Sequence, residues 1–240
     1  MSRRHLATAA SALVIVGGLA GCGGDSTVIE TLTTDQSPTT APAPTAPAAS
    51  APTTTAAPTA TTGRLRESDL PALTSVEDVR SGTVRTLDDP QAFVDALYQA
   101  GDPSKPQART RLEDAGYSGA VLRDQEGEDA STGIALLRSY VLGLRDDAAA
   151  QDEVDRAADE VKSASSAPTT DIDLPEVPGA RALRVDIDQG GVKGAVVFAT
   201  FAVGSRVYGI QGVSGGDAAV PQDDLLQAAR DLHAEVTAAP

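Results

Sequence analysis

The sequence is poor in the residues that build covalent or metal-held folds. It has one cysteine, two histidines and no tryptophan. With no second cysteine in the chain, no internal disulfide framework can form, so the folded part must be held by its core. One cysteine and two histidines also do not predict a usual zinc site. Aromatic residues make up only 3% of the chain, so we expect a core of valine, leucine, isoleucine and alanine.

Basic residues are also in short supply. The chain has 34 acidic against 19 basic residues, a formal net charge of −15. A surface this acidic repels phosphate backbones, so we expect no nucleic-acid partner. The sequence contains no phosphate-binding glycine loop, no lysine–serine dyad and no evident pair of catalytic carboxylates. It therefore predicts no cofactor, no metal and no catalytic residue.

The N-terminus has the features of an export signal. Arg3 and Arg4 precede a short apolar run that ends at Leu19-Ala20-Gly21-Cys22. This run is shorter than the roughly 20 residues that a membrane-spanning helix needs. Its end resembles the lipobox of a bacterial lipoprotein signal peptide. The resemblance implies that residues 1–21 are removed and that Cys22 carries diacylglycerol, which anchors the protein to the outer face of the cell membrane. The alternative is an ordinary secretory signal in which Cys22 is incidental.

Residues 22–63 are built mainly of threonine, alanine, proline and serine. Such a segment buries too little apolar surface to offset the entropy of ordering it, so we predict a disordered tether after the lipidated Cys22. The remaining residues, 64–240, are enough for one core and too few for two comfortable domains. We therefore predict a single globular domain there.

The hydrophobic pattern of this domain predicts helices and strands in an irregular order. Four helices are expected, over 90–100, 106–115, 146–163 and from 221 toward the C-terminus. Five strands are expected, over 117–123, 133–144, 181–187, 192–203 and 205–213, with a loop over 165–179. Strands joined by short turns favour an antiparallel sheet. The predicted fold class is α+β, an antiparallel sheet of about five strands with helices packed over it.

Two of the predicted strands carry further information. In the strand 133–144, Ile134, Leu136, Tyr140 and Leu142 share one parity, which marks a buried face interrupted by Arg138. Arg138 is expected to form an internal ion pair, with a carboxylate from a helix as one candidate partner, or to reach solvent at the end of the strand. Otherwise it would line a cleft that takes an anion. The strand 192–203 is apolar on both parities, so we predict a central strand covered on both faces.

A few local motifs suggest chemistry. Gly212-Val213-Ser214-Gly215-Gly216 matches the G-x-S-x-G pattern of a serine hydrolase. However, His233 lies only 19 positions later, in a predicted helix, so a glycine-rich loop is the simpler interpretation, with His233 on the surface. Asp186 to Gly190 begins like a calcium loop, but the twelfth position is Val197. The acidic run at 124–129 is interpreted as solvated charge.

The segment from Leu174 to Arg181, with Arg206-Val207-Tyr208 further on, resembles actinobacterial envelope lipoproteins of unknown function. The resemblance implies an extracytoplasmic α+β domain without assigned activity or site residues. Our first hypothesis is a non-enzymatic binding module, anchored to the membrane by its N-terminal lipid, for an unknown envelope protein or a small apolar or lipid ligand. The alternatives are a serine hydrolase using Ser214 and an envelope sensor or regulatory domain. A cleft between sheet and helices would favour a small ligand, and a solid core would favour a protein partner.

Overall fold

The computed structural model describes residues 64–128, 133–165, 167–189, 192–214 and 220–238. The predicted signal peptide, the lipidated Cys22 and the tether over 22–63 lie outside the described residues and stay predictions. Within the described ranges, no helix combines the length and apolarity needed to cross a lipid bilayer.

The domain is built on one antiparallel sheet of seven strands, in the order β1-β2-β3-β7-β6-β5-β4. The strands are β1 (Thr83–Leu87), β2 (Gly119–Glu126), β3 (Ile134–Gly143), β4 (Thr169–Ile172), β5 (Arg181–Gln189), β6 (Val192–Val203) and β7 (Arg206–Ser214). The α+β class is confirmed. The sheet has two more strands than the five expected. The additional strands are β1 and β4, which form its two edges. The loop predicted over 165–179 is wrong in part, since β4 lies within it.

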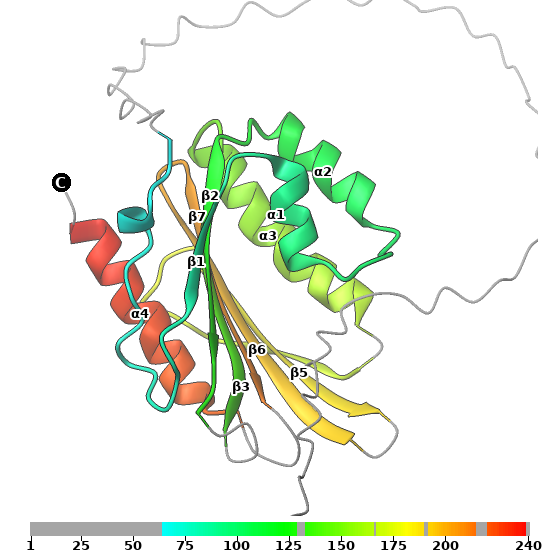
Figure 1. Ribbon diagram of the computed structural model, residues 1–240, viewed down its shortest axis with the longest axis vertical. Coiled ribbons are helices and arrows are strands. Elements are labelled where there is room, and N and C mark those ends of the chain that lie inside the picture. The colour runs from blue at the N-terminus through cyan, green and yellow to red at the C-terminus, as the bar shows by residue number, and fades with distance from the viewer. Residues whose placement is uncertain (1–63, 129–132, 166, 190–191, 215–219, 239–240) are drawn as a thin grey trace, which may run out of the picture. The chain divides into compact units, whose positions relative to one another are not determined.

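Four α-helices cover the sheet, all close to their predicted positions. They are α1 (Pro90–Leu97), α2 (Lys105–Asp114), α3 (Asp147–Ala164) and α4 (Gln222–Ala238). Figure 1 shows α1, α2 and α3 on one side of the sheet and α4 on the other. The chain before β1 joins the α4 side, where Leu65, Leu70, Leu73 and Val76 are buried in the same cluster as Leu225. The sheet therefore has an apolar layer on each face.

The first turn of α3 is fixed by the side chain before it. Asp146 accepts a hydrogen bond from the backbone N–H of Ala149 (2.8 Å). This bond satisfies one of the amide groups that a helix N-terminus leaves without an intrahelical partner. The Ala149 N–H, with Arg145 beside it, holds the pKa of Asp146 below its ordinary value of 3.8.

We expect Asp146→Ala to lower the urea midpoint of unfolding at neutral pH, because the cap of α3 is lost. A carboxyl whose pKa is lower in the folded state stabilises the fold above its ordinary pKa, and this contribution disappears as the pH falls through the folded pKa. The difference in urea midpoint between the parent and the variant should therefore become smaller below pH 3.8. Urea titrations of both proteins at several pH values measure it, and a gap that widens in acid would contradict the capping role.

The central strands are buried on both faces, as predicted for β6. On β6, Val197 and Phe201 face the α4 layer, whereas Phe198 faces the layer under α3. The single buried parity predicted for β3 is wrong. Leu137 and Val141 are also buried, in the α4 layer, and a register irregularity between Ile134 and Leu136 places Ile134 in that layer as well. Such an irregularity reverses the alternation of faces along a strand.

Two glycines of β7 allow close packing on opposite faces of the sheet. A Cβ at Gly209 would lie 2.2 Å from Cζ of Tyr140, which sits opposite it on β3. A Cβ at Gly212 would lie 2.4 Å from Cδ1 of Leu225 on α4. Both positions need a residue without a side chain, because van der Waals contact between carbons begins near 3.5 Å. Gly209 thus makes room for the Tyr140 ring, and Gly212 makes room for α4.

Candidate ligand pocket

A small pocket lies between the sheet and the helices α1, α2 and α3. Its volume is about 120 Å³. Helices supply Phe93, Leu97, Leu112, Ala157 and Val161, and strands supply Tyr140, Leu142, Phe198 and Val207. These side chains make the lining mostly apolar, as is usual for sites that bind small molecules.

Aromatic rings are concentrated at this pocket. The chain has three phenylalanines and four tyrosines. Four of these seven residues, Phe93, Tyr98, Tyr140 and Phe198, line the pocket. The rings of Phe93 and Tyr140 meet edge to face at 5.6 Å. The missing side chain at Gly209 is what lets the Tyr140 ring lie here.

One polar side chain of the sheet also lines the pocket. Gln211 lies on β7 between Arg138 of β3 and Phe198 of β6. Its amide group carries two donors and one acceptor oxygen. The cross-strand neighbours place it on the face of the sheet that the three helices cover. Gln211 therefore gives a mostly apolar pocket one group that can orient a ligand.

Charged side chains close one side of the pocket. Arg111 of α2 reaches across to α3, where its Nε and Nη2 donate to both carboxylate oxygens of Glu153 (3.1 and 3.0 Å). Its Nη1 donates to Glu160 (3.0 Å). The hydroxyl of Tyr98 donates to the other oxygen of Glu160 (2.8 Å). We call Tyr98, Arg111, Glu153 and Glu160 the gate.

Burial governs the protonation of the gate. The Glu153 residue is only 7% exposed. This burial raises the pKa of Glu153, and the guanidinium of Arg111 opposes the shift. Burial also raises the pKa of Tyr98, and the charge of Glu160 adds to it, so the phenol stays protonated and can donate. One guanidinium against two carboxyl groups gives the gate a formal charge of −1 when both are ionised.

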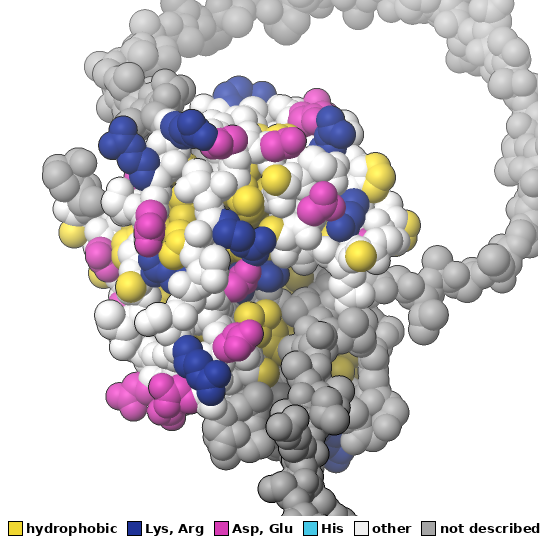
Figure 2. All heavy atoms as spheres, viewed as in Figure 1, with side chains coloured by type: hydrophobic (Ala, Val, Ile, Leu, Met, Phe, Trp, Pro, Cys, Tyr) yellow, Lys and Arg dark blue, Asp and Glu magenta, His cyan; other side chains and the backbone are white. Residues whose placement is uncertain are grey.

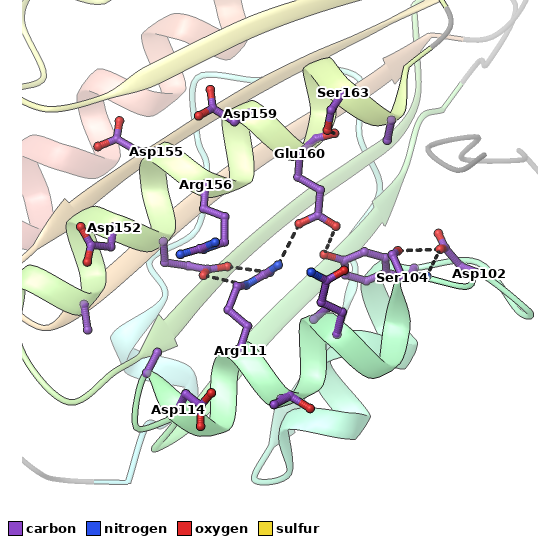
Figure 3. A pocket seen from close by; sticks show the side chains of 18 of the residues that line it. Asp102, Ser104, Arg111, Asp114, Asp152, Asp155, Arg156, Asp159, Glu160 and Ser163 are labelled. Atoms are coloured by element: carbon purple, nitrogen blue, oxygen red, sulfur yellow. Dashed lines mark hydrogen bonds and ion pairs between the residues drawn. The ribbon is translucent and has the colours of Figure 1, made fainter. Parts of the chain in front are cut away.

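A wider groove lies on the outer side of the gate, between α2 and α3. Figure 3 shows Arg111 reaching from α2 toward Glu160 on α3, with Asp152 and Arg156 further along the same helix. The groove carries three arginines, at 111, 145 and 156. Its seven carboxylates are Asp102, Asp114, Asp152, Glu153, Asp155, Asp159 and Glu160. The excess of carboxylates makes the groove acidic. All four gate residues line both the groove and the pocket, so the gate separates the two.

The rest of the visible surface is mixed in charge. On the face in Figure 2, basic and acidic side chains are interspersed, with apolar side chains between them. Arg85 of β1 pairs with Asp124 of β2 at 2.6 Å. Asp124 also accepts a hydrogen bond from Arg138 Nε (2.6 Å). Arg138 forms an ion pair as expected, but its partner lies on the neighbouring strand β2 and not on a helix.

Ser214 and His233, the residues considered for a serine hydrolase, contact other parts of the fold. Ser214 is buried at the end of β7, and its Oγ accepts a hydrogen bond from the backbone N–H of Ala195 (2.9 Å). The same hydroxyl lies 3.4 Å from the Ala195 carbonyl oxygen. His233 is half-buried on α4, with its ring edge-on to Phe201 at 5.4 Å, rather than on the surface as expected. Within the described residues, Ser214 and His233 make no hydrogen bond with each other, so the structure lends this alternative no support.

The described part of the calcium-loop pattern, residues 186–189, lies at the end of β5, and Gly190 lies outside the described residues. Asp186 accepts a hydrogen bond from Arg184 (2.8 Å), and Asp188 lies opposite Lys193. Across the described residues, side chains of His, Cys, Asp and Glu nowhere gather in threes in a way suited to a metal ion.

Sequence reasoning did not find the pocket or its gate. Arg111 lies 42 positions from Glu153 and 49 from Glu160, so no local motif joins them. One signal was present. Glu153 and Glu160 are seven positions apart and thus lie on one side of α3, beside the stripe of Val154, Ala157 and Val161. Two carboxylates bordering an apolar stripe indicate charges that need an internal partner.

Comparison with known protein families gives no match to the chain, and comparison with curated proteins gives none. Among solved structures, the fold is similar to the extracellular domain of PknH from Mycobacterium tuberculosis. The identity is 13%, the TM-score is 0.39, and the match covers 72% of this chain and 92% of the other. A likeness this distant says nothing about what the domain binds.

Proposed function

We propose that the domain is a non-catalytic binding module for a small, largely apolar ligand, held outside the cell by a lipid on Cys22. The pocket between the sheet and α1–α3 carries this proposal. Its walls are mostly apolar, its volume is about 120 Å³, and a charged gate separates it from an open groove. The anchor rests on the lipobox resemblance of the sequence around Cys22.

The size of the pocket limits the ligand. An apolar cavity of about 150 Å³ is known to bind benzene. The pocket of about 120 Å³ therefore suits one ring or a short branched alkyl group. A long acyl chain would have to extend out of it. A ligand that places a compact group in the pocket and the rest of its structure in the groove beyond the gate would occupy both cavities.

Filling the pocket should remove the ligand. Ala157 of α3 lines the pocket, so Ala157→Leu places three further carbons inside it. We expect native mass spectrometry of the full chain, purified from its host, to show a bound small molecule on the parent and none on this variant. Ala148→Leu is the matched control, because Ala148 is exposed on the same helix. A parent that carries no bound molecule, or an Ala157→Leu variant that keeps it, would refute the binding module.

The anchor has a separate test. We expect the intact mass of the membrane-associated protein to correspond to a chain that begins at an acylated Cys22. The Cys22→Ala variant should lack the lipid and be released from the membrane fraction. An unmodified Cys22 in the mature protein would contradict the anchor and leave the pocket unaffected.

A further inference from the structure

We infer that the ligand of the pocket is a small organic cation, an ammonium whose nitrogen carries alkyl groups, held by the aromatic rings and the carboxylates of the gate. The inference rests on the proposed function, since it names the chemical class that the same pocket would take. Two independent features carry it, namely the rings that line the pocket and the sign of the charge at its entrance.

The rings favour a cation over a neutral group of equal size. Phe93, Tyr98, Tyr140 and Phe198 line a pocket of about 120 Å³. The face of an aromatic ring is electronegative and attracts a cation within about 6 Å of its centre, most strongly away from water. An alkylated ammonium also has an apolar surface that packs against Leu112 and Val207 in the same lining. A pocket built of aromatic and aliphatic side chains therefore suits a cation covered with methyl or methylene groups.

The charge at the entrance excludes an anion. A ligand carboxylate inside the pocket would have to pair with Arg111, the basic residue of its lining, whose Nε and Nη2 already hold Glu153 in a bidentate pair. It would also displace Glu160 into a groove that carries seven carboxylates and three arginines. A cation is favoured instead, because the acidic groove attracts it and raises its local concentration at the gate.

Glu160 is the gate residue best placed to receive the cation. It is held to Arg111 through a single nitrogen, Nη1 (3.0 Å), whereas Glu153 is held through two. An ammonium group can take the place of Nη1 beside Glu160 while the Arg111–Glu153 pair stays intact. Tyr98 would continue to donate its hydroxyl to Glu160. The gate thus admits a cation without leaving a buried carboxylate alone.

The test compares two probes of equal shape and different charge. Choline carries a trimethylammonium group, and 3,3-dimethylbutan-1-ol has carbon in place of its nitrogen. We expect isothermal titration calorimetry on the full chain to give choline a Kd about tenfold lower, an ordinary gain for a desolvated cation on aromatic rings. The anion 3,3-dimethylbutanoate should not bind measurably. Ala157→Leu should abolish choline binding.

Glu160→Gln should reduce choline's advantage over the neutral alcohol without abolishing it, because the four aromatic rings stay in the lining. The Kd of the alcohol should be nearly unchanged. Glu235→Gln, an exposed change on α4 across the sheet, is the matched control. Urea midpoints of both variants establish that they fold. The inference that the ligand is a cation would be wrong if choline and the alcohol bound equally well, or if the anion bound more tightly than choline. Neither result would contradict the proposed binding module. Failure of all three probes to bind would overturn the inference, whereas the binding module is decided by the mass measurement on the purified parent.

Discussion

Arg111→Met is expected to lower the free energy of unfolding by about 3 kcal/mol, the usual cost of removing one partner of a buried ion pair. Methionine keeps most of the length and apolar stem of arginine, so packing against α3 changes little. The cost comes from Glu153, which is 7% exposed and loses both of its hydrogen bonds to Arg111. Denaturant titration at pH 7.5 measures the effect.

The pH dependence identifies the cause. Without Arg111, nothing in the gate opposes the burial that raises the pKa of Glu153. A carboxyl whose folded pKa lies above its unfolded value stabilises the fold below that unfolded value, and this stability is lost as the pH rises through the folded pKa. The difference in free energy of unfolding between the parent and Arg111→Met should therefore become smaller from pH 7.5 toward pH 5. Adding Glu153→Gln should recover part of the loss. A gap that does not change with pH would point to lost packing instead.

Gly209→Val is expected to lower the free energy of unfolding by about 3 kcal/mol, at the upper end of the cost of overpacking a core. The first carbon of the new side chain would lie 2.2 Å from Cζ of Tyr140. The Tyr140 ring is buried and packed against Phe93, so it has no free space to move into except the pocket. We therefore expect the variant to lose ligand binding together with stability.

A double-mutant cycle isolates the contact between the two strands. Tyr140→Leu removes the ring that the valine strikes, so Gly209→Val should cost much less in that background. The difference between the two costs measures the clash. If Gly209→Val is equally costly with and without the ring, the strain lies in the backbone of β7 and not in the packing of Tyr140.

The sequence predicted the helices and the central strands well, because their apolar residues recur with a clear period. Leu225, Ala229 and Leu232 of α4 recur at intervals of four and three residues, and all three are buried on the sheet. The two edge strands were missed for a physical reason. In β1 and β4 every side chain is exposed or only partly buried, so their sequences show no marked alternation of apolar and polar residues. A strand at an edge contacts one neighbour and has less apolar surface to bury.

The pocket could not be predicted because it depends on how separate elements are packed. Phe93 and Leu97 look like an ordinary helix stripe, and Phe198 looks like an ordinary strand residue. Only the packing of α1 and α3 over β6 and β7 shows that these side chains leave a gap between them. The prediction that only one face of β3 is buried was wrong for a similar reason. The irregularity after Ile134 arises where β3 pairs with β7, a strand far away in the sequence.

The strand order has a consequence for how the chain reaches this structure. Five of the six strand pairings join strands that follow one another in the sequence, and the pairing of β3 with β7 is the exception. Residues 134–143 must find residues 206–214 across the whole of α3 and three intervening strands. The entropic cost of closing so long a loop has to be met before its contacts form. We therefore expect the joining of the N-terminal and C-terminal parts of the sheet, at β3 and β7, to be the slow step of folding.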